Sequence, residues 1–127
     1  MTQPTIYLTN WSSKKLYGPG RKFTIMAAPR WWEHGDGTVQ GLVPSLPDLL
    51  GYRTGQISLA EYNTRYIQMV RPNLATLTPE GPVLKDGDTL CCACSRDVAA
   101  KGACHRVWAA TLLREAGWRV ILDGAEI

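Results

Sequence analysis

The sequence predicts an α/β fold in a single domain over residues 1–127, with a small, mostly parallel sheet flanked by helices and a C-terminal βαβ unit. Short runs of β-branched and aromatic residues alternate with stretches of helical composition. Near the carboxyl terminus two strand-like runs enclose a helical one, and such a crossover joins parallel strands. A chain of 127 residues, 45% of them hydrophobic, can bury its own core. We therefore expect helices on both faces of the sheet.

The first 30 residues predict two strands. Residues 5–9 and 22–26 are rich in β-branched and aromatic side chains; the first run ends at Asn10 and the second before Pro29. Residues 10–21 contain serine, glycine and proline, so we expect a loop without a helix between the strands.

Two helices are predicted in the middle of the chain. Ser45 is the expected N-cap of a short helix that Gly51 closes. Ser58 and Glu61 form a capping box, which predicts a longer helix running to Pro72. Because proline disfavours helical angles in the residue before it, we expect this helix to end or kink there, and an added turn over 73–77 stays open.

The βαβ unit occupies the last third of the chain. An Asp-Gly turn at 86–87 precedes an apolar run over 89–93, which is typical of a central strand covered on both sides. Residues 103–116 have helical composition, Gly117 stands at the expected C-terminal cap, and residues 118–122 form the last strand. We expect these two strands to be parallel and their crossover right-handed.

Composition indicates a cytoplasmic protein without a membrane partner. Residues 1–5 lack the basic and apolar segments of a signal peptide, and no apolar run approaches the roughly 20 residues that a bilayer requires. Three of the four cysteines lie within four positions of one strand-like run, where neighbouring side chains point to opposite faces. Reduced thiols are therefore expected in place of disulfides.

The net charge of +3 is unevenly distributed. Residues 1–30 contain no acidic residue, and the basic segment 14–30 could meet phosphate groups. A solvated basic loop is an equally good interpretation of this segment. Its basic residues are Lys14, Lys15, Arg21, Lys22 and Arg30.

The four thiols are not expected to be equivalent. On a strand, Cys92 and Cys94 face one side of the sheet and Cys91 the other. Cys91 and Cys92 are predicted to be small core residues, and Cys94 lies where the chain leaves the core. Cys104 falls at the start of the last helix, where unpaired N–H groups lower the pKa of a thiol and attract anions.

The carboxyl ends of parallel strands meet at one edge of the sheet, where α/β proteins build their ligand sites. His105 titrates near neutral pH, and Arg106 is a bidentate donor for phosphate or carboxylate. The predicted catalytic residues are Cys94, Cys104 and His105. The predicted ligand-binding residues are Arg106, Arg96, Asn10, Trp11, Arg30 and Trp31.

Several interpretations of this region stay open. In the first, a thiol nucleophile, His105 as acid/base group and an arginine clamp bind or act on a phosphate-bearing ligand, either a nucleotide or a nucleic-acid end. In the second, an accessory protein binds nucleic acid through residues 14–30 without catalysis. The third is a zinc-stabilised domain that uses Cys94, Cys104, His105 and one further ligand. Purely structural contacts of His105 and Arg106 are a fourth, and no cofactor or oligomeric state is indicated.

The motifs of the chain resemble the family called domain of unknown function 488. The resemblance implies a strand running into a cysteine-containing end, a Cys-His-Arg triplet that opens a helix, and a final strand. It is most specific in the triplet, and the chain differs in having Cys94 and Ser95 where many members have an acidic residue. The similar segments are Leu90-Cys91-Cys92-Ala93-Cys94, Cys104-His105-Arg106, Val43-Pro44-Ser45, Leu49-Leu50, Glu61-Tyr62, Arg65-Tyr66 and Pro29-Arg30.

Overall fold

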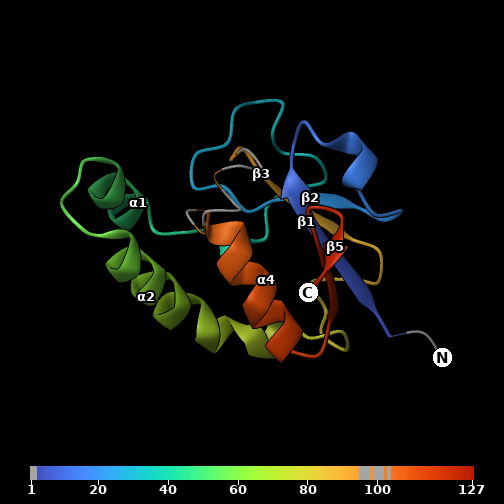
Figure 1. The fold of residues 1–127 in the computed structure, drawn as a ribbon. Helices are drawn as coiled ribbons and strands as arrows, with labels where there is room; N and C mark the ends of the chain where they lie inside the picture. Colours follow the sequence, from blue (N-terminus) through green and yellow to red (C-terminus); the bar gives the residue numbers. More distant parts are fainter. Residues whose placement is uncertain (1–2, 95–97, 99–101, 103) are drawn as a thin grey trace.

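The structure, a computed structural model, describes residues 3–94, 98, 102 and 104–127 and has the expected α/β fold (Figure 1). Five strands form one sheet in the order β2-β3-β1-β4-β5. The pairs within β2-β3-β1-β4 are parallel, and β5 runs antiparallel to β4. The strands are β1 (Thr5–Asn10), β2 (Lys22–Thr24), β3 (Thr89–Cys92), β4 (Arg119–Leu122) and β5 (Ala125–Glu126).

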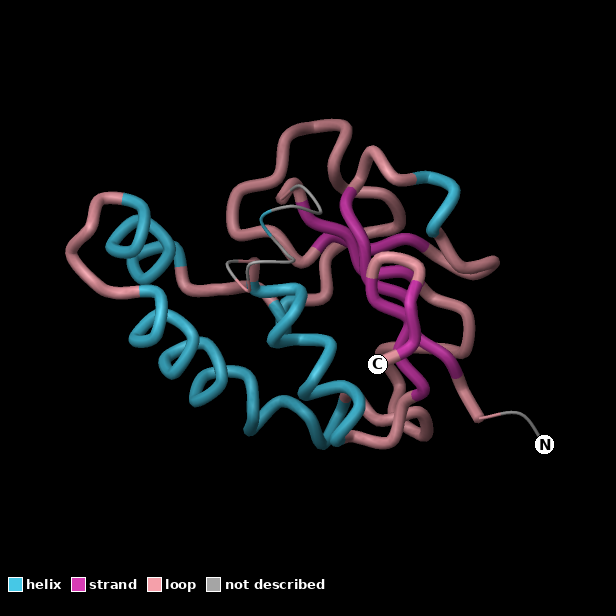
Figure 2. Tube along the Cα trace, viewed as in Figure 1, coloured by secondary structure: helices cyan, strands magenta, loops and turns pink. Residues whose placement is uncertain are grey.

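The α-helices whose bounds the structure describes lie together on one side of the sheet (Figure 2). They are α1 (Leu46–Arg53), α2 (Leu59–Val70) and α4 (His105–Glu115), and three 3-10 helices are η1 (Lys14–Leu16), η2 (Gln40–Leu42) and η3 (Arg71–Thr76).

The second face of the sheet is covered differently from what the sequence led us to expect. The segment 11–21, which includes η1, lies there in place of an α-helix. Gly18 packs so closely on Tyr7 that an added Cβ would lie 2.3 Å from its ring. The backbone N–H of Gly18 also donates to Thr89 Oγ1 at 2.7 Å. A glycine-rich loop can approach the sheet this closely, so one face needs no α-helix.

The core lies between the sheet and helices α2 and α4. Ile6 and Leu8 of β1, with Leu90 of β3 and Val120 of β4, are almost completely buried against it. The alternation of side chains along each strand explains this, since these positions share one face. Trp108 of α4 joins them. No helix in the described ranges is both long and apolar enough to cross a membrane.

The end of α1 differs from the predicted one, and the end of α2 is as predicted but without the expected change in the angles of Arg71. Helix α1 continues through Gly51 to Arg53, and Thr54 is its C-cap. Arg71 has helical angles, φ −52° and ψ −41°, so the chain passes from α2 directly into η3. Pro72 lies in the first turn of η3, where its missing N–H is not needed. The α-helix therefore ends just before Pro72 as expected, at Val70, and the open turn after it is present as part of η3.

The C-terminal βαβ unit is confirmed, with one addition. Strands β3 and β4 are both parallel to β1 and lie on its two sides, so the unit spans β1. Helix α4 begins after Cys104 and ends before Gly117, whose φ of 109° is the left-handed conformation expected at a C-terminal cap. The added strand β5 forms a hairpin with β4 through Asp123 and Gly124, both with positive φ.

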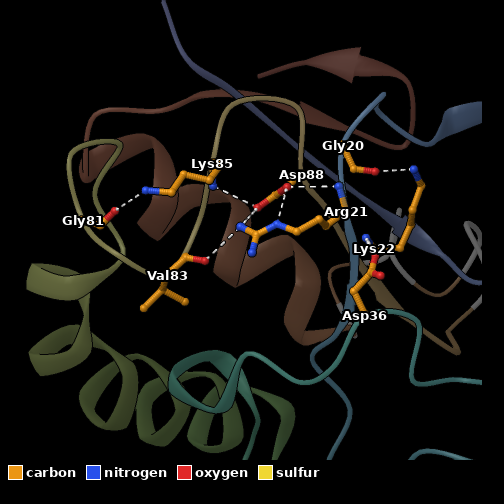
Figure 3. A network of polar contacts seen from close by, with 8 residues as sticks. All are labelled: Gly20, Arg21, Lys22, Asp36, Gly81, Val83, Lys85 and Asp88. Carbon is orange, nitrogen blue, oxygen red and sulfur yellow. Dashed lines mark hydrogen bonds and ion pairs between the residues drawn. The ribbon is translucent and has the colours of Figure 1, made fainter.

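A polar network holds the amino ends of β2 and β3 together (Figure 3). The Asp88 carboxylate, 2% exposed, accepts hydrogen bonds from the Arg21 backbone N–H at 3.1 Å and the Lys85 backbone N–H at 2.9 Å. The Arg21 guanidinium pairs with the same carboxylate at 2.7 Å and donates to the Val83 carbonyl at 3.3 Å. This network fixes the end of the sheet opposite the cysteines.

Candidate functional site

Three thiols meet at the carboxyl edge of the sheet. Cys92 is the last residue of β3, Cys94 follows two positions later, and Cys104 is the N-cap of α4. Their Sγ atoms all lie within 4.8 Å of one another, and those of Cys92 and Cys104 are 3.3 Å apart. Side-chain alternation places Cys92 and Cys94 together and excludes Cys91, as predicted. All four cysteines are free thiols. We call Cys92, Cys94 and Cys104 the three-thiol cluster.

Arg106 lies beside this cluster and is completely buried. Its Nη1 donates to the Cys94 carbonyl at 2.7 Å and contacts Cys92 Sγ at 3.2 Å and Cys104 Sγ at 3.7 Å. Its Nη2 and Nε donate to Asp123 Oδ2 at 3.0 and 3.3 Å. The expected anion clamp is therefore an internal ion pair that joins the ends of β3 and β4 to α4. A guanidinium with no exposed surface does not face an anion arriving from solvent.

The environment separates the acidities of the thiols. Hydrogen bonds from Cys104 and Cys92, together with the nearby Arg106 charge, lower the pKa of Cys94 to about 2. The pKa of Cys104 is raised well above its usual range, because its thiol is held as a donor by Cys92 and Cys94 and because burial disfavours a thiolate. The negative charge of the cluster is therefore placed on Cys94. Buried Cys104, a predicted nucleophile, is the thiol that keeps its proton in this arrangement.

His105 is buried in the first turn of α4, with its Nε2 atom 2.7 Å from the Ile25 carbonyl oxygen. Since a carbonyl only accepts, Nε2 carries the proton and the neutral ring offers Nδ1 as an acceptor. Burial lowers the pKa of His105 to about 4, so the imidazole is neutral at neutral pH. The ring also packs on Tyr66, with 5.6 Å between ring centroids.

A cleft opens where Cys94 and His105 reach the surface beneath α1. It consists of two neighbouring hollows that share Leu49, Arg53, Cys94 and His105, and we call it the Cys94 cleft. Arg53, in the last turn of α1, is exposed. The further lining residues are Met26, Ala27, Ala28, Pro44, Leu46, Tyr52, Tyr62, Cys92, Ala93, Val98 and Cys104.

Tyr62 contributes an unusual group to this lining. Its side chain is 2% exposed, and its hydroxyl is buried without a hydrogen-bond partner in the described part of the chain. Burial raises the pKa of Tyr62, with the nearby thiols adding to the shift, so the hydroxyl keeps its proton. A buried hydroxyl without a partner costs free energy, about 1–3 kcal/mol. Tyr62 lines the cleft, so a ligand that reaches this hydroxyl would remove that cost by accepting its hydrogen bond.

The other predicted ligand-binding residues lie in different places. Trp11 and Arg30 line a second hollow with Ser12, Trp32 and Glu33, and Ala93 borders both this hollow and the Cys94 cleft. Asn10 is buried, and its Oδ1 accepts from the Ser12 hydroxyl at 2.8 Å. Trp31 is 84% exposed and contacts Trp32 edge to face. Arg96 lies outside the described residues.

The basic segment 14–30 divides into bound and exposed charges. Arg21 is paired with Asp88, and the Lys22 ammonium donates to the Gly20 carbonyl. Lys14 and Lys15 are exposed and line a hollow with Ser12, Ser13 and Leu16. The segment therefore offers fewer charges to a partner than its composition suggests.

The predicted zinc ligands do not converge as expected. The Nε2 atom of His105 is engaged by the Ile25 carbonyl, whereas Cys92 joins Cys94 and Cys104 in one group of possible metal ligands. Sequence reasoning placed Cys92 in the core, which is correct, but missed its thiol contacts.

Two further site residues were missed. Asp123 directly follows a parallel strand, so the rule that placed Cys94 at the carboxyl edge could have found it. Arg53 is positioned by how α1 packs, and no local pattern marks it.

Comparisons of the chain with protein-family models, with characterised proteins and with solved structures give no match.

Proposed function

We propose that this chain binds a small phosphate-bearing ligand, such as a nucleotide, in the Cys94 cleft. The observation that carries the proposal is the convergence of a cation, a thiol and an unpartnered hydroxyl on one cleft, from Arg53, Cys94 and Tyr62. The cleft lies at the carboxyl ends of parallel strands, where ligand sites of α/β proteins are commonly built.

The charge of the cleft favours an anion. Arg53 is its arginine, and no carboxylate is among the described lining residues. A guanidinium forms paired hydrogen bonds with phosphate oxygens, which makes arginine well suited to this role. The buried Arg106 guanidinium, which is paired with Asp123, lies behind this wall, offsets the negative charge of Cys94 and does not touch the ligand.

The remaining walls favour an apolar group attached to the phosphate. Met26, Leu46 and Leu49 line the side of the cleft next to α1. A flat ring between these side chains and a phosphate on Arg53 would leave Cys94 and the Tyr62 hydroxyl facing the middle of the ligand. We propose that Cys94 contacts the ligand as a nucleophile if the protein is an enzyme, with neutral His105 as its neighbour. Membership of the domain of unknown function 488 family is part of the same proposal and rests on the Cys-His-Arg motif.

Binding of AMP and ADP, with adenosine as the uncharged comparison, tests this proposal by isothermal titration calorimetry. We expect Arg53→Met to weaken nucleotide binding by about tenfold or more, ~1.4 kcal/mol. Tyr62→Phe should weaken it less, and Arg114→Met, an exposed arginine on α4, should have no effect. Binding of adenosine as tight as that of AMP, or an unchanged Arg53→Met variant, would contradict a phosphate site in the cleft.

A second function is favoured by one observation on the basic segment. Arg30 lies 5.3 Å above the Trp32 ring, beside the exposed Trp31, and exposed aromatic and basic side chains are what a single-stranded nucleic acid stacks on. This version predicts that affinity for an oligonucleotide falls steeply with salt. The Lys14→Ala/Lys15→Ala variant should reduce the salt slope by about two. If oligonucleotide binding is unaffected by this variant and insensitive to salt, nucleic-acid binding through the basic segment is excluded.

A further inference from the structure

We propose that the three-thiol cluster binds one divalent, thiol-seeking cation, and zinc is the ion whose chemistry it fits best. The ligands are the Sγ atoms of Cys92, Cys94 and Cys104. The proposal does not require nucleotide binding, but it shares Cys94 with the cleft, and with an ion bound Cys94 is a ligand and not a free nucleophile. It also differs from the zinc set expected from the sequence, because Cys92 takes the place of His105.

The distances within the cluster suit a single ion. The three sulfurs lie within 4.8 Å of one another, and Cys92 and Cys104 are 3.3 Å apart. With Zn–S bonds of about 2.3 Å, sulfurs in a tetrahedral site are ~3.8 Å apart, which lies between these values. An ion can therefore be reached by small side-chain rotations. The thiols also come from two elements of fixed relative position, the end of β3 and the start of α4.

Cys104 occupies a position that helix capping does not explain. It is the N-cap of α4, and its side chain makes no capping hydrogen bond. Serine, threonine, aspartate and asparagine are the residues that stabilise this position, and cysteine is not among them. Its sulfur instead points to Cys92 and Arg106. A ligand role accounts for a cysteine at this position.

The surrounding charge fits a divalent ion. Three thiolates with a divalent cation carry one net negative charge, whereas a monovalent ion would leave two. The buried Arg106 guanidinium, with Nη1 3.2 Å from Cys92 Sγ, supplies a positive charge and an N–H···S contact. Donors of this kind next to the ligating atoms orient them and stabilise their ionised form. Asp123, on the other edge of the guanidinium, holds Arg106 in this orientation.

The cluster leaves one coordination position open. In the described part of the chain, no other histidine, cysteine or carboxylate belongs to the group. Cys94 is half-buried and borders the cleft, whereas Cys92 and Cys104 are 1% exposed. Access for the ion, and the open position, are therefore on the cleft side. A three-ligand zinc site with an open fourth position is the type that binds water or a substrate.

Cobalt(II) is the probe for this site, because its bonds to thiolate give a charge-transfer band and its ligand-field bands report geometry. The protein is reduced and stripped with a chelator before titration. We expect one equivalent of cobalt to bind with a thiolate band, and one equivalent of zinc to remove it. Cys94→Ser should lose most of the band, and the adjacent Cys91→Ser, on the other face of the strand, should keep it. Circular dichroism checks that both variants are folded.

Two results would overturn the proposal. One is the absence of a thiolate band in the wild-type chain. The other is an equal band in Cys94→Ser, which would mean that the ion binds elsewhere. Arg53→Met separates the two proposals, since it should weaken nucleotide binding and leave the cobalt spectrum unchanged.

Discussion

Two ion pairs stand at opposite ends of the same sheet, and they are buried in opposite ways. At the amino end, the Asp88 carboxylate is 2% exposed and its partner Arg21 is 46% exposed (Figure 3). At the carboxyl end, the Arg106 side chain is 0% exposed and its partner Asp123 is 16% exposed. One end of the sheet buries an anion and the other buries a cation.

The difference lies in the atoms that surround each buried charge. Asp88 is surrounded by N–H groups of Arg21 and Lys85, which stay protonated and leave the carboxylate satisfied. Arg106 meets a carboxylate and a carbonyl, but also two sulfurs that can lose a proton or bind a metal. The amino end therefore has a structural role, and the carboxyl end can change its charge or its partner.

Loss of the Asp123 carboxylate should have the largest effect on stability. Asp123→Ala removes the Asp123 carboxylate from the buried Arg106 guanidinium, and loss of one partner of a buried ion pair costs about 3–5 kcal/mol of unfolding free energy. Denaturant unfolding of the metal-free protein measures this cost. The double variant Asp123→Ala/Arg106→Met should recover a large part of it, because the stranded charge is gone. A loss below about 1 kcal/mol in Asp123→Ala would show that the charge is compensated elsewhere.

At the amino end, Asp88→Ala should cost less, about 2–3 kcal/mol, because it strands backbone N–H groups and not a buried charge. Arg21→Met should cost about 1 kcal/mol or less, since its guanidinium is largely solvated. Denaturant unfolding compares the two variants. Cobalt and nucleotide binding should be unchanged in both, and a changed cobalt spectrum in Asp88→Ala would mean that the two ends are coupled.

A smaller effect concerns the second face of the sheet, where Tyr17 donates to the Trp11 carbonyl near Cys91. Burial, with the neighbouring Cys91, raises the pKa of Tyr17 to about 12, from an ordinary value of about 10. The folded state therefore binds more protons than the unfolded state between these values, and its stability falls as pH rises from about 10 to about 12. In an alkaline titration followed by phenolate absorbance, the Tyr17→Phe variant should have one tyrosine fewer that ionises at high pH than the wild-type chain. An identical titration of the variant would place the shift on another tyrosine.

The elements of the fold were largely predictable from the sequence, because they depend on local patterns. The capping box at Ser58 and the glycine at 117 correctly placed one end of α2 and of α4. The failures were also local in origin. Gly51 was tolerated inside α1, and Arg71 kept helical angles before Pro72 because η3 continues the turn. A hairpin as short as β4-β5 has too few residues to show a period of its own.

The sequence predicted where the candidate site lies, but not which of its side chains are buried. Side-chain alternation and the edge rule brought Cys94, Cys104 and His105 together at the carboxyl edge. They could not show that Arg106 is buried, because its depth depends on how α4 packs between β4 and the end of β3. The same limit applies to Tyr62, which lines the cleft only because of the packing of α2 on α4. Whether a polar group faces solvent or the interior is decided by tertiary contacts.

The placement of β1 between β3 and β4 has a consequence for the order of assembly. The thiols and Arg106 come from β3 and α4, but Asp123, which balances Arg106, comes from the end of β4, 17 positions after Arg106. Until β4 pairs with β1, the guanidinium lacks the Asp123 carboxylate that helps to balance its burial. Formation of the complete site therefore depends on the docking of β4 against β1, a pairing that involves neither β3 nor α4.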